Sequence, residues 1–98
     1  VVVDNRGGGI FSFLPQATAL PVDDFERIFG TPHDVDLAQL ASVHGLRAVT
    51  VMGRADLVEA LEDAEQVGGV HVVVARTDRA DNVQVHRQIH AAIAAALT

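Results

Sequence analysis

The residues best suited to chemistry stand near the start of the chain, where three valines lead into Asp4, Asn5 and three glycines at positions 7–9. An Asn side-chain oxygen is a hard ligand that suits Mg²⁺, which prefers six oxygens and is often shared with phosphates. Glycines permit positive φ and let the backbone approach a ligand closely. Ligands of open α/β sheets bind beyond the carboxyl ends of the strands. The pattern indicates one half of a Mg²⁺–diphosphate site; a glycine-rich turn between a strand and a helix is the alternative.

Histidines form a second set of candidates. His86 and His90 are four residues apart, the spacing of two metal ligands on one helix face. No third ligand accompanies them, so packing or surface roles are favoured. His33, in the segment Thr31-Pro32-His33, belongs to a loop and is a candidate for a role at an active site.

The surrounding pattern alternates strands with helices. An apolar run without polar alternation at residues 1–3 predicts a strand buried on both faces. One helical turn is expected at 10–14, and residues 16–35, which contain Pro21 and Pro32, are expected to be mostly loop with a short helical segment at 25–29. The remaining elements are strands at 47–51 and 70–75 and helices at 36–44, 54–67 and from 81 onward.

Local signals mark the helix ends. Asp36 with Gln39 and Asp81 with Gln84 form candidate capping boxes, and Gly45 is a natural C-terminal cap. Strands that alternate with helices imply right-handed crossovers and a parallel sheet. The expected fold class is α/β, a three-layer α/β/α arrangement with a parallel sheet.

Composition limits the class of protein. The 98 residues allow one domain at most, and 49% of them are hydrophobic, enough for an apolar core. A net charge of −6 argues against a nucleic-acid partner. No apolar run approaches the roughly 18 residues that span a bilayer, and the first residues lack the features of a signal peptide. The absence of cysteine is compatible with the cytoplasm, which is the expected location.

The start of the chain leads to an expectation about its completeness. A chain that begins inside an apolar strand, without Met, is expected to be a piece of a larger domain. That first strand is expected to have a neighbour outside this chain, because parallel sheets are usually covered on both faces.

Two stretches, "VVVDNRGGGIFSFLPQ" and "FERIFGTPHDVDLAQLASVHGL", resemble the thiamine-diphosphate (ThDP) enzymes, and among them the SEPHCHC synthase family of menaquinone biosynthesis. The resemblance implies that residues 1–98 are the C-terminal half of the ThDP diphosphate-binding domain, with the other domains outside this chain. It implies that Asn5 ligates Mg²⁺ through its side chain and Gly7 through its carbonyl. The full set of cofactor-binding residues implied by the family is Asn5, Gly7, Gly8, Ile10, Phe11 and Leu14.

The sequence departs from the family pattern in two ways. Asp4 stands where the family has the first Asn of a pair, a position that is not a ligand. The Gly-Asp-Gly half of the motif, which carries a further metal ligand, lies outside this chain.

The resemblance also implies a reaction: ThDP-dependent decarboxylation of 2-oxoglutarate and addition of the succinyl unit to isochorismate. The activating Glu and the substrate-carboxylate residues belong to other parts of such an enzyme, so no catalytic residue is assigned here, and the chain alone is expected to be inactive. The whole protein is expected to be a homodimer or homotetramer. The rival hypothesis is a non-catalytic α/β module with a glycine-rich anion-binding turn. Acetolactate synthase is disfavoured by "IFSFLPQ" and "FGTPH".

Overall fold

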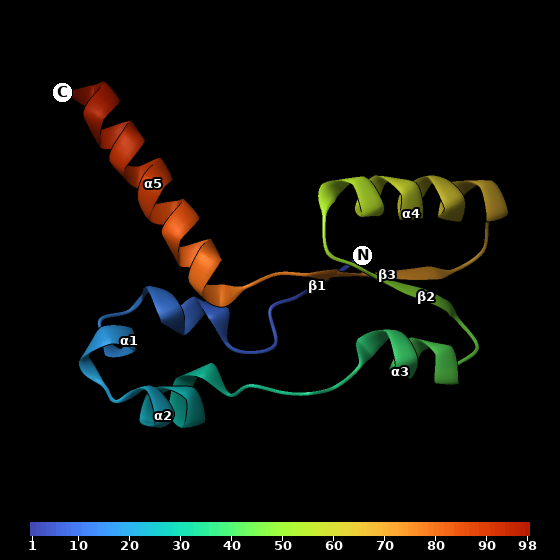
Figure 1. Ribbon diagram of the computed structural model, residues 1–98, viewed down its shortest axis with the longest axis horizontal. Coiled ribbons are helices and arrows are strands. Elements are labelled where there is room, and N and C mark those ends of the chain that lie inside the picture. Colours follow the sequence, from blue (N-terminus) through green and yellow to red (C-terminus); the bar gives the residue numbers. More distant parts are fainter. The chain divides into compact units, whose positions relative to one another are not determined.

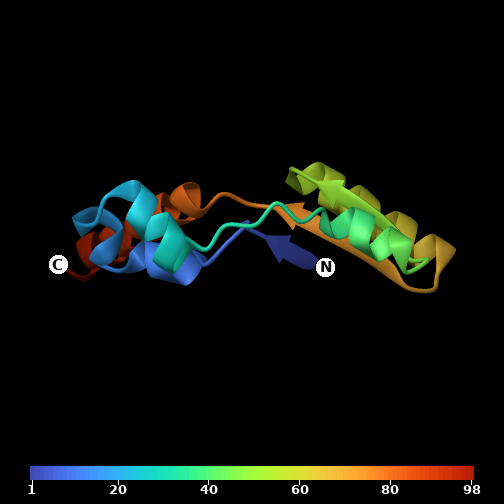
Figure 2. The ribbon, with the colours of Figure 1, turned by 90° about the horizontal axis from the view of Figure 1, so that it is seen from below.

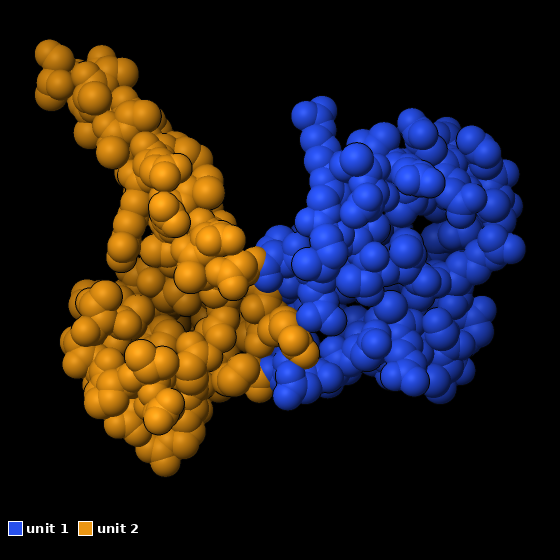
Figure 3. Space-filling model, in the orientation of Figure 1, with its two compact units in different colours: residues 1–4, 33–77 blue, residues 5–32, 78–98 orange.

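The computed structural model describes residues 1–98, which divide into two compact units (Figure 3). Unit 1 consists of residues 1–4 and 33–77, and unit 2 consists of residues 5–32 and 78–98. The chain therefore leaves unit 1 directly after Asp4, and Asn5 is the first residue of unit 2.

Unit 1 is built on a parallel sheet of three strands, β1 (Val2–Asp4), β2 (Arg47–Val51) and β3 (His71–Arg76). The strand order is β1-β3-β2, and the register pairs Asp4 with Arg76 and Val51 with Ala75. Figure 2 shows β1 alongside β3. The predicted α/β class with a parallel sheet is confirmed, and the three strands lie within one residue of their predicted bounds.

Helices lie on both faces of this sheet. α3 (Leu37–Val43) and α4 (Arg54–Val67) each contact β2 and β3, and Figure 1 shows them on opposite sides of the strands. The chain passes from β1 over β3 to β2 and then returns to β3. Right-handed crossovers in opposite directions place their helices on opposite faces. Unit 1 thus has the three predicted layers.

The core of unit 1 is small and made of valines. Val51, Val73 and Val74 are buried, with Val74 only 1% exposed. Within residues 1–98, β1 pairs with β3 alone, and Val1 and Val3 are each 69% exposed. This chain by itself therefore does not bury β1 on both faces, and burial by a neighbour outside the chain stays a prediction.

The helix ends of unit 1 follow their local signals. The Asp36 carboxylate accepts a hydrogen bond from the backbone N–H of Gln39 at 2.9 Å, which caps α3. Gly45, just beyond α3, has a φ of +75°, and Gly68 after α4 has a φ of +73°. Both are left-handed conformations that favour glycine. α4 has the predicted bounds.

Unit 2 contains more helix than the sequence predicts. The predicted turn at 10–14 is the 3-10 helix η1 (Gly9–Phe13). The interpretation of residues 16–35 as mostly loop is wrong, because they include α1 (Gln16–Ala19), α2 (Val22–Phe25) and a π-helical turn, η2 (Glu26–Gly30). Pro15 and Pro21 stand directly before α1 and α2. A proline ends one helix, but its fixed φ also suits the start of the next.

The last helix, α5 (Arg79–Leu97), starts earlier than predicted. Its cap is Asp78, whose carboxylate accepts hydrogen bonds from the N–H groups of Ala80 at 2.7 Å and Asp81 at 2.9 Å. The prediction of Asp81 as the capping residue is therefore wrong; Asp81 lies within the first turn. None of the helices combines the length and apolar character that crossing a membrane requires.

Candidate functional site

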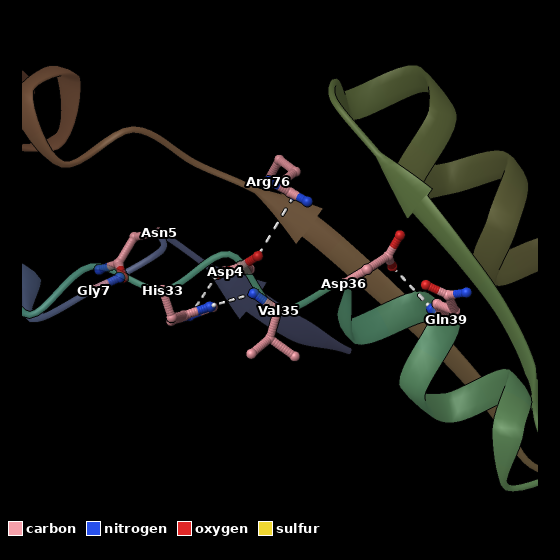
Figure 4. A network of polar contacts seen from close by, with 8 residues as sticks. All are labelled: Asp4, Asn5, Gly7, His33, Val35, Asp36, Gln39 and Arg76. Carbon is pink, nitrogen blue, oxygen red and sulfur yellow. Dashed lines mark hydrogen bonds and ion pairs between the residues drawn. The ribbon is translucent and has the colours of Figure 1, made fainter.

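Asp4, at the end of β1, makes a backbone hydrogen bond and charged side-chain contacts within unit 1. The Asp4 carbonyl accepts a hydrogen bond from the N–H of Thr77 at 3.0 Å. The Asp4 side chain is 2% exposed; its Oδ1 lies 3.6 Å from His33 Nε2, and its Oδ2 lies 3.5 Å from Arg76 Nε (Figure 4). The His33 Nδ1 accepts from the N–H of Val35 at 3.3 Å, so the proton of a neutral ring is on Nε2, toward Asp4.

The cluster of Asp4, His33 and Arg76 was not predicted from the sequence. The family resemblance gives Asp4 only the position of an Asn, whereas the structure makes it the buried partner of the Arg76 guanidinium and the His33 ring. His33, the loop residue predicted as a candidate for an active-site role, lies against Asp4. A charged residue directly after an apolar strand run is the one signal that could have indicated a buried ion pair, because such charges are rarely buried unless paired.

Asn5 begins the loop that follows β1. Its Oδ1 accepts a hydrogen bond from the backbone N–H of Gly7 at 3.1 Å, which closes a tight turn (Figure 4). The carbonyl of Gly7 in turn accepts from the N–H of Gly9 at 3.1 Å. The two oxygens that the family resemblance assigns to Mg²⁺ therefore belong to one short, internally bonded loop.

The donor set of this loop fits Mg²⁺ in type. An amide oxygen and a backbone carbonyl are the hard, neutral ligands that Mg²⁺ accepts, and each oxygen has a second lone pair beyond the hydrogen bond that it accepts. Two oxygens make up about a third of an octahedral shell. The chain contains no group of three or more His, Cys, Asp or Glu side chains arranged to hold a metal ion. A Mg²⁺ ion held by these two oxygens would therefore need further oxygens from elsewhere.

The glycines of this loop allow its backbone to lie close to the backbone of η2. A Cβ on Gly7 would lie 2.5 Å from the Gly30 carbonyl oxygen, and one on Gly8 would lie 2.5 Å from that of Phe29. The N–H of Gly8 donates to the Gly30 carbonyl at 2.7 Å. Any side chain at these positions would push the loop away from η2.

Positive φ, the other expected use of these glycines, is found at Arg6 instead, with a φ of +59°. Thr31, which ends η2, has a φ of +38°. Non-glycine residues adopt this region at a cost of roughly 1–2 kcal/mol. Both turns that border the contact between the glycine loop and η2 therefore carry backbone strain.

The apolar residues assigned to the cofactor lie on and after η1. Ile10 is 74% exposed, Leu14 is 42% exposed and Phe11 is 37% exposed. The Phe11 ring packs against Phe29 with a centroid distance of 5.5 Å, and Phe29 stacks on the buried Phe25 at 5.7 Å. Phe11 is thus anchored within unit 2, whereas Ile10 and Leu14 present apolar surface; their contact with a cofactor stays a prediction.

The paired histidines have packing roles in unit 2. The His86 ring meets Phe13 edge-on at 5.1 Å, and its Nδ1 lies 2.9 Å from the Asn82 carbonyl oxygen. His90 contacts His86 ring to ring at 6.4 Å. The packing interpretation of the spacing between His86 and His90 is consistent with these contacts.

Comparison with known proteins adds an independent line of observation. No protein-family model matches the chain. Curated proteins named 2-succinyl-5-enolpyruvyl-6-hydroxy-3-cyclohexene-1-carboxylate (SEPHCHC) synthase match 99% of it, with 48% identity for the Myxococcus xanthus protein, 46% for that of Thermobifida fusca and 44% for that of Chloroflexus aurantiacus.

The chain matches a segment of SEPHCHC synthase. The resemblance stated from the two motifs is thereby confirmed, and it extends over nearly the whole chain, including the part beyond residue 46. The chain spans about 16% of the length of these SEPHCHC synthases.

Proposed function

We propose that residues 5–14 of this chain contribute to the Mg²⁺–ThDP site of a SEPHCHC synthase. The observation that carries the proposal is 48% identity to the Myxococcus xanthus SEPHCHC synthase over 99% of the chain. The loop geometry supports it, since Asn5 and Gly7 offer two hard oxygens directly after the carboxyl end of a parallel strand.

Within this proposal the loop holds the metal. The Asn5 side-chain oxygen and the Gly7 carbonyl would ligate Mg²⁺, and the absence of a side chain at Gly8 keeps the loop close to η2. Bound ThDP supplies the carbanion chemistry of the reaction. The protein's contribution from this chain is to bind and orient the group.

The apolar side chains have a second task. Ile10, Phe11 and Leu14 offer exposed apolar surface on one short segment. Beside a bound cofactor, these side chains would exclude water from the site and so limit unwanted proton transfer. The ring contact between Phe11 and Phe29 restrains this segment.

The proposal for the complete protein follows the relatives' name. Under this proposal, the complete protein decarboxylates 2-oxoglutarate and adds the succinyl unit to isochorismate in menaquinone biosynthesis. It acts in the cytoplasm as a homodimer or homotetramer. Residues 1–98 form the C-terminal half of the diphosphate-binding domain, and alone they are inactive because they contain two of the protein ligands and no activating Glu.

A chimeric enzyme tests the proposal. In this chimeric synthase, residues 1–98 replace the segment that they match in the Myxococcus xanthus SEPHCHC synthase. We expect the chimeric synthase to bind Mg²⁺–ThDP in calorimetric titration and to form SEPHCHC. Asn5→Ala should weaken cofactor binding about 10- to 100-fold, in the range for loss of a group that holds a metal site.

Gln66→Ala is the matched control, since it also removes an amide, from an exposed position of α4. Normal cofactor affinity in the Asn5→Ala variant would refute the metal assignment. A folded chimeric synthase that binds no cofactor would refute the proposed function itself.

A further inference from the structure

A bidentate salt bridge joins the first turn of α5 to η2, between residues that are 53 positions apart in the sequence. Arg79 Nη1 donates to Glu26 Oε1 at 3.1 Å, and Arg79 Nη2 donates to Glu26 Oε2 at 2.6 Å. The side chains are 18% and 34% exposed. Two parallel charge-assisted bonds of this kind define both the position and the orientation of the partners.

The Arg79 side chain also lies against the glycine loop. Its Cζ is 3.3 Å from the point that a Cβ on Gly7 would occupy, and its Cγ is 3.7 Å from the corresponding point at Gly9. The missing side chains of these glycines thus leave the space in which Arg79 lies. Gly7 is the residue whose carbonyl is proposed to bind the metal.

Glu26 connects to the same loop through η2. A Cβ on Gly30 would lie 2.6 Å from Glu26 Oε2 and 2.7 Å from Arg79 Nη1. The Gly30 carbonyl accepts the hydrogen bond from Gly8 at 2.7 Å. The loop, η2 and the start of α5 therefore form a closed ring of contacts, in which the ion pair links α5 to η2 and the bond from Gly8 to Gly30 links η2 to the loop.

The positive charge of Arg79 is paired with Glu26 within this ring of contacts. Both Nη nitrogens donate to Glu26, so the guanidinium is neutralised and oriented by the protein. This arrangement suits a group that supports a loop and does not itself grip an anion.

We infer that Arg79 and Glu26 are positioning residues that hold the Asn5–Gly9 loop in its metal-binding conformation. The inference rests on the proposed function for its consequence in cofactor binding. The support of the loop itself depends only on the contacts above. Outer residues that orient metal ligands typically change metal affinity 10- to 100-fold when they are replaced.

Two measurements on the chimeric synthase test the inference, with three variants: Arg79→Gln, Glu26→Gln and Gly30→Ala. The last pushes the ion pair apart without removing a charge, because the new methyl group meets both side-chain ends. We expect each variant to raise the Mg²⁺–ThDP concentration for half-maximal activity about tenfold or more, with kcat at saturation changed less than about threefold. Arg79→Lys, which keeps the charge but loses the fork, should be intermediate.

The second measurement needs no cofactor. Hydrogen exchange of the loop amides in the cofactor-free chimeric synthase should become about tenfold faster in the same variants, because the opened loop loses the bond from Gly8 to Gly30. Asp24→Asn is the matched control, since it removes another Arg–carboxylate pair of unit 2, that of Asp24 with Arg27 at 3.1 Å, which is exposed. It should change neither readout.

Unchanged exchange and unchanged cofactor affinity in the Arg79→Gln and Gly30→Ala variants would overturn the inference while leaving the proposed function intact, provided that Asn5→Ala still weakens binding. Faster exchange with no cofactor binding in any form would uphold the role in loop support and overturn the proposed function. A fall in kcat alone would overturn the positioning role in cofactor binding.

Discussion

Replacing Gly8 by Ala tests the close approach of the glycine loop to η2. The added Cβ would lie 2.5 Å from the Phe29 carbonyl oxygen and 3.3 Å from Phe11 Cδ2. Ordinary contact begins at 3.4 Å, so the loop and η2 must separate by about 0.9 Å at this point. The first of these neighbours is backbone and has no rotamer with which to escape.

The cost follows from two contributions. Overpacking of this kind costs about 1–3 kcal/mol. The separation also stretches the 2.7 Å bond from the residue 8 amide to the Gly30 carbonyl, and loss of such a bond costs about 0.5–1.5 kcal/mol. The free energy of local opening should therefore fall by about 1.5–4.5 kcal/mol. Since about 1.4 kcal/mol is a factor of ten, the amide of residue 8 should exchange about 10- to 1,600-fold faster.

Hydrogen exchange measured by mass spectrometry on peptides that cover residues 5–14 of the chimeric synthase is the assay. Gly53→Ala is the control, because a Cβ there meets nothing closer than Asp56 Oδ2 at 3.9 Å. Gly53 caps α4, so its replacement should cost only about 0.5 kcal/mol. An exchange rate within about twofold of the unmodified protein for Gly8→Ala would refute the described contact between the loop and η2.

Two further changes test the packing and the helix start. Val74 is 1% exposed, and Val74→Ala should reduce the stability of unit 1 by about 2–3 kcal/mol. Val49 is 45% exposed, and Val49→Ala should cost less than about 1 kcal/mol. Hydrogen exchange of the β3 amides measures both, and equal costs would contradict the assigned core. Asp78→Ala should destabilise the first turn of α5 by about 1 kcal/mol, because its carboxylate holds two N–H groups, while Asp81→Ala should cost about 0.5 kcal/mol through the helix dipole alone. A larger effect at Asp81 in amide exchange of that turn would restore the capping role predicted from the sequence.

Helix ends could be predicted where the signal is local. Asp36 and Gln39 are three residues apart, and the cap they form needs only the chain's own geometry. Gly45 and Gly68 end helices because a left-handed residue is required at those points. The start of α5 shows the limit of such signals. Asp78 and Asp81 both fit a cap, and only the extended conformation of Asp78, with a φ of −111° and a ψ of 135°, decides between them.

The burial of β1 could not be predicted from residue type. Three valines have the composition of an interior strand, but exposure depends on which strands are neighbours. Within residues 1–98, the order β1-β3-β2 leaves this strand with one neighbour, with Val3 exposed and Asp4 buried. A charged residue becomes the interior member because His33 and Arg76 come to it from other segments.

Sequence alone determined the three strands and the helices α3, α4 and α5, the parallel α/β class and the assignment of Asn5 and the glycine run as the candidate site, but not the helical segments α1, α2 and η2. These follow from hydrophobic period, caps and motif residues, all of which act within a few positions. Only the tertiary structure decided that the glycines contact Phe29 and Gly30, and that Arg79 with Glu26 closes the ring around them. Such contacts join distant segments, and their specificity comes from backbone approach and paired charges that no local pattern encodes.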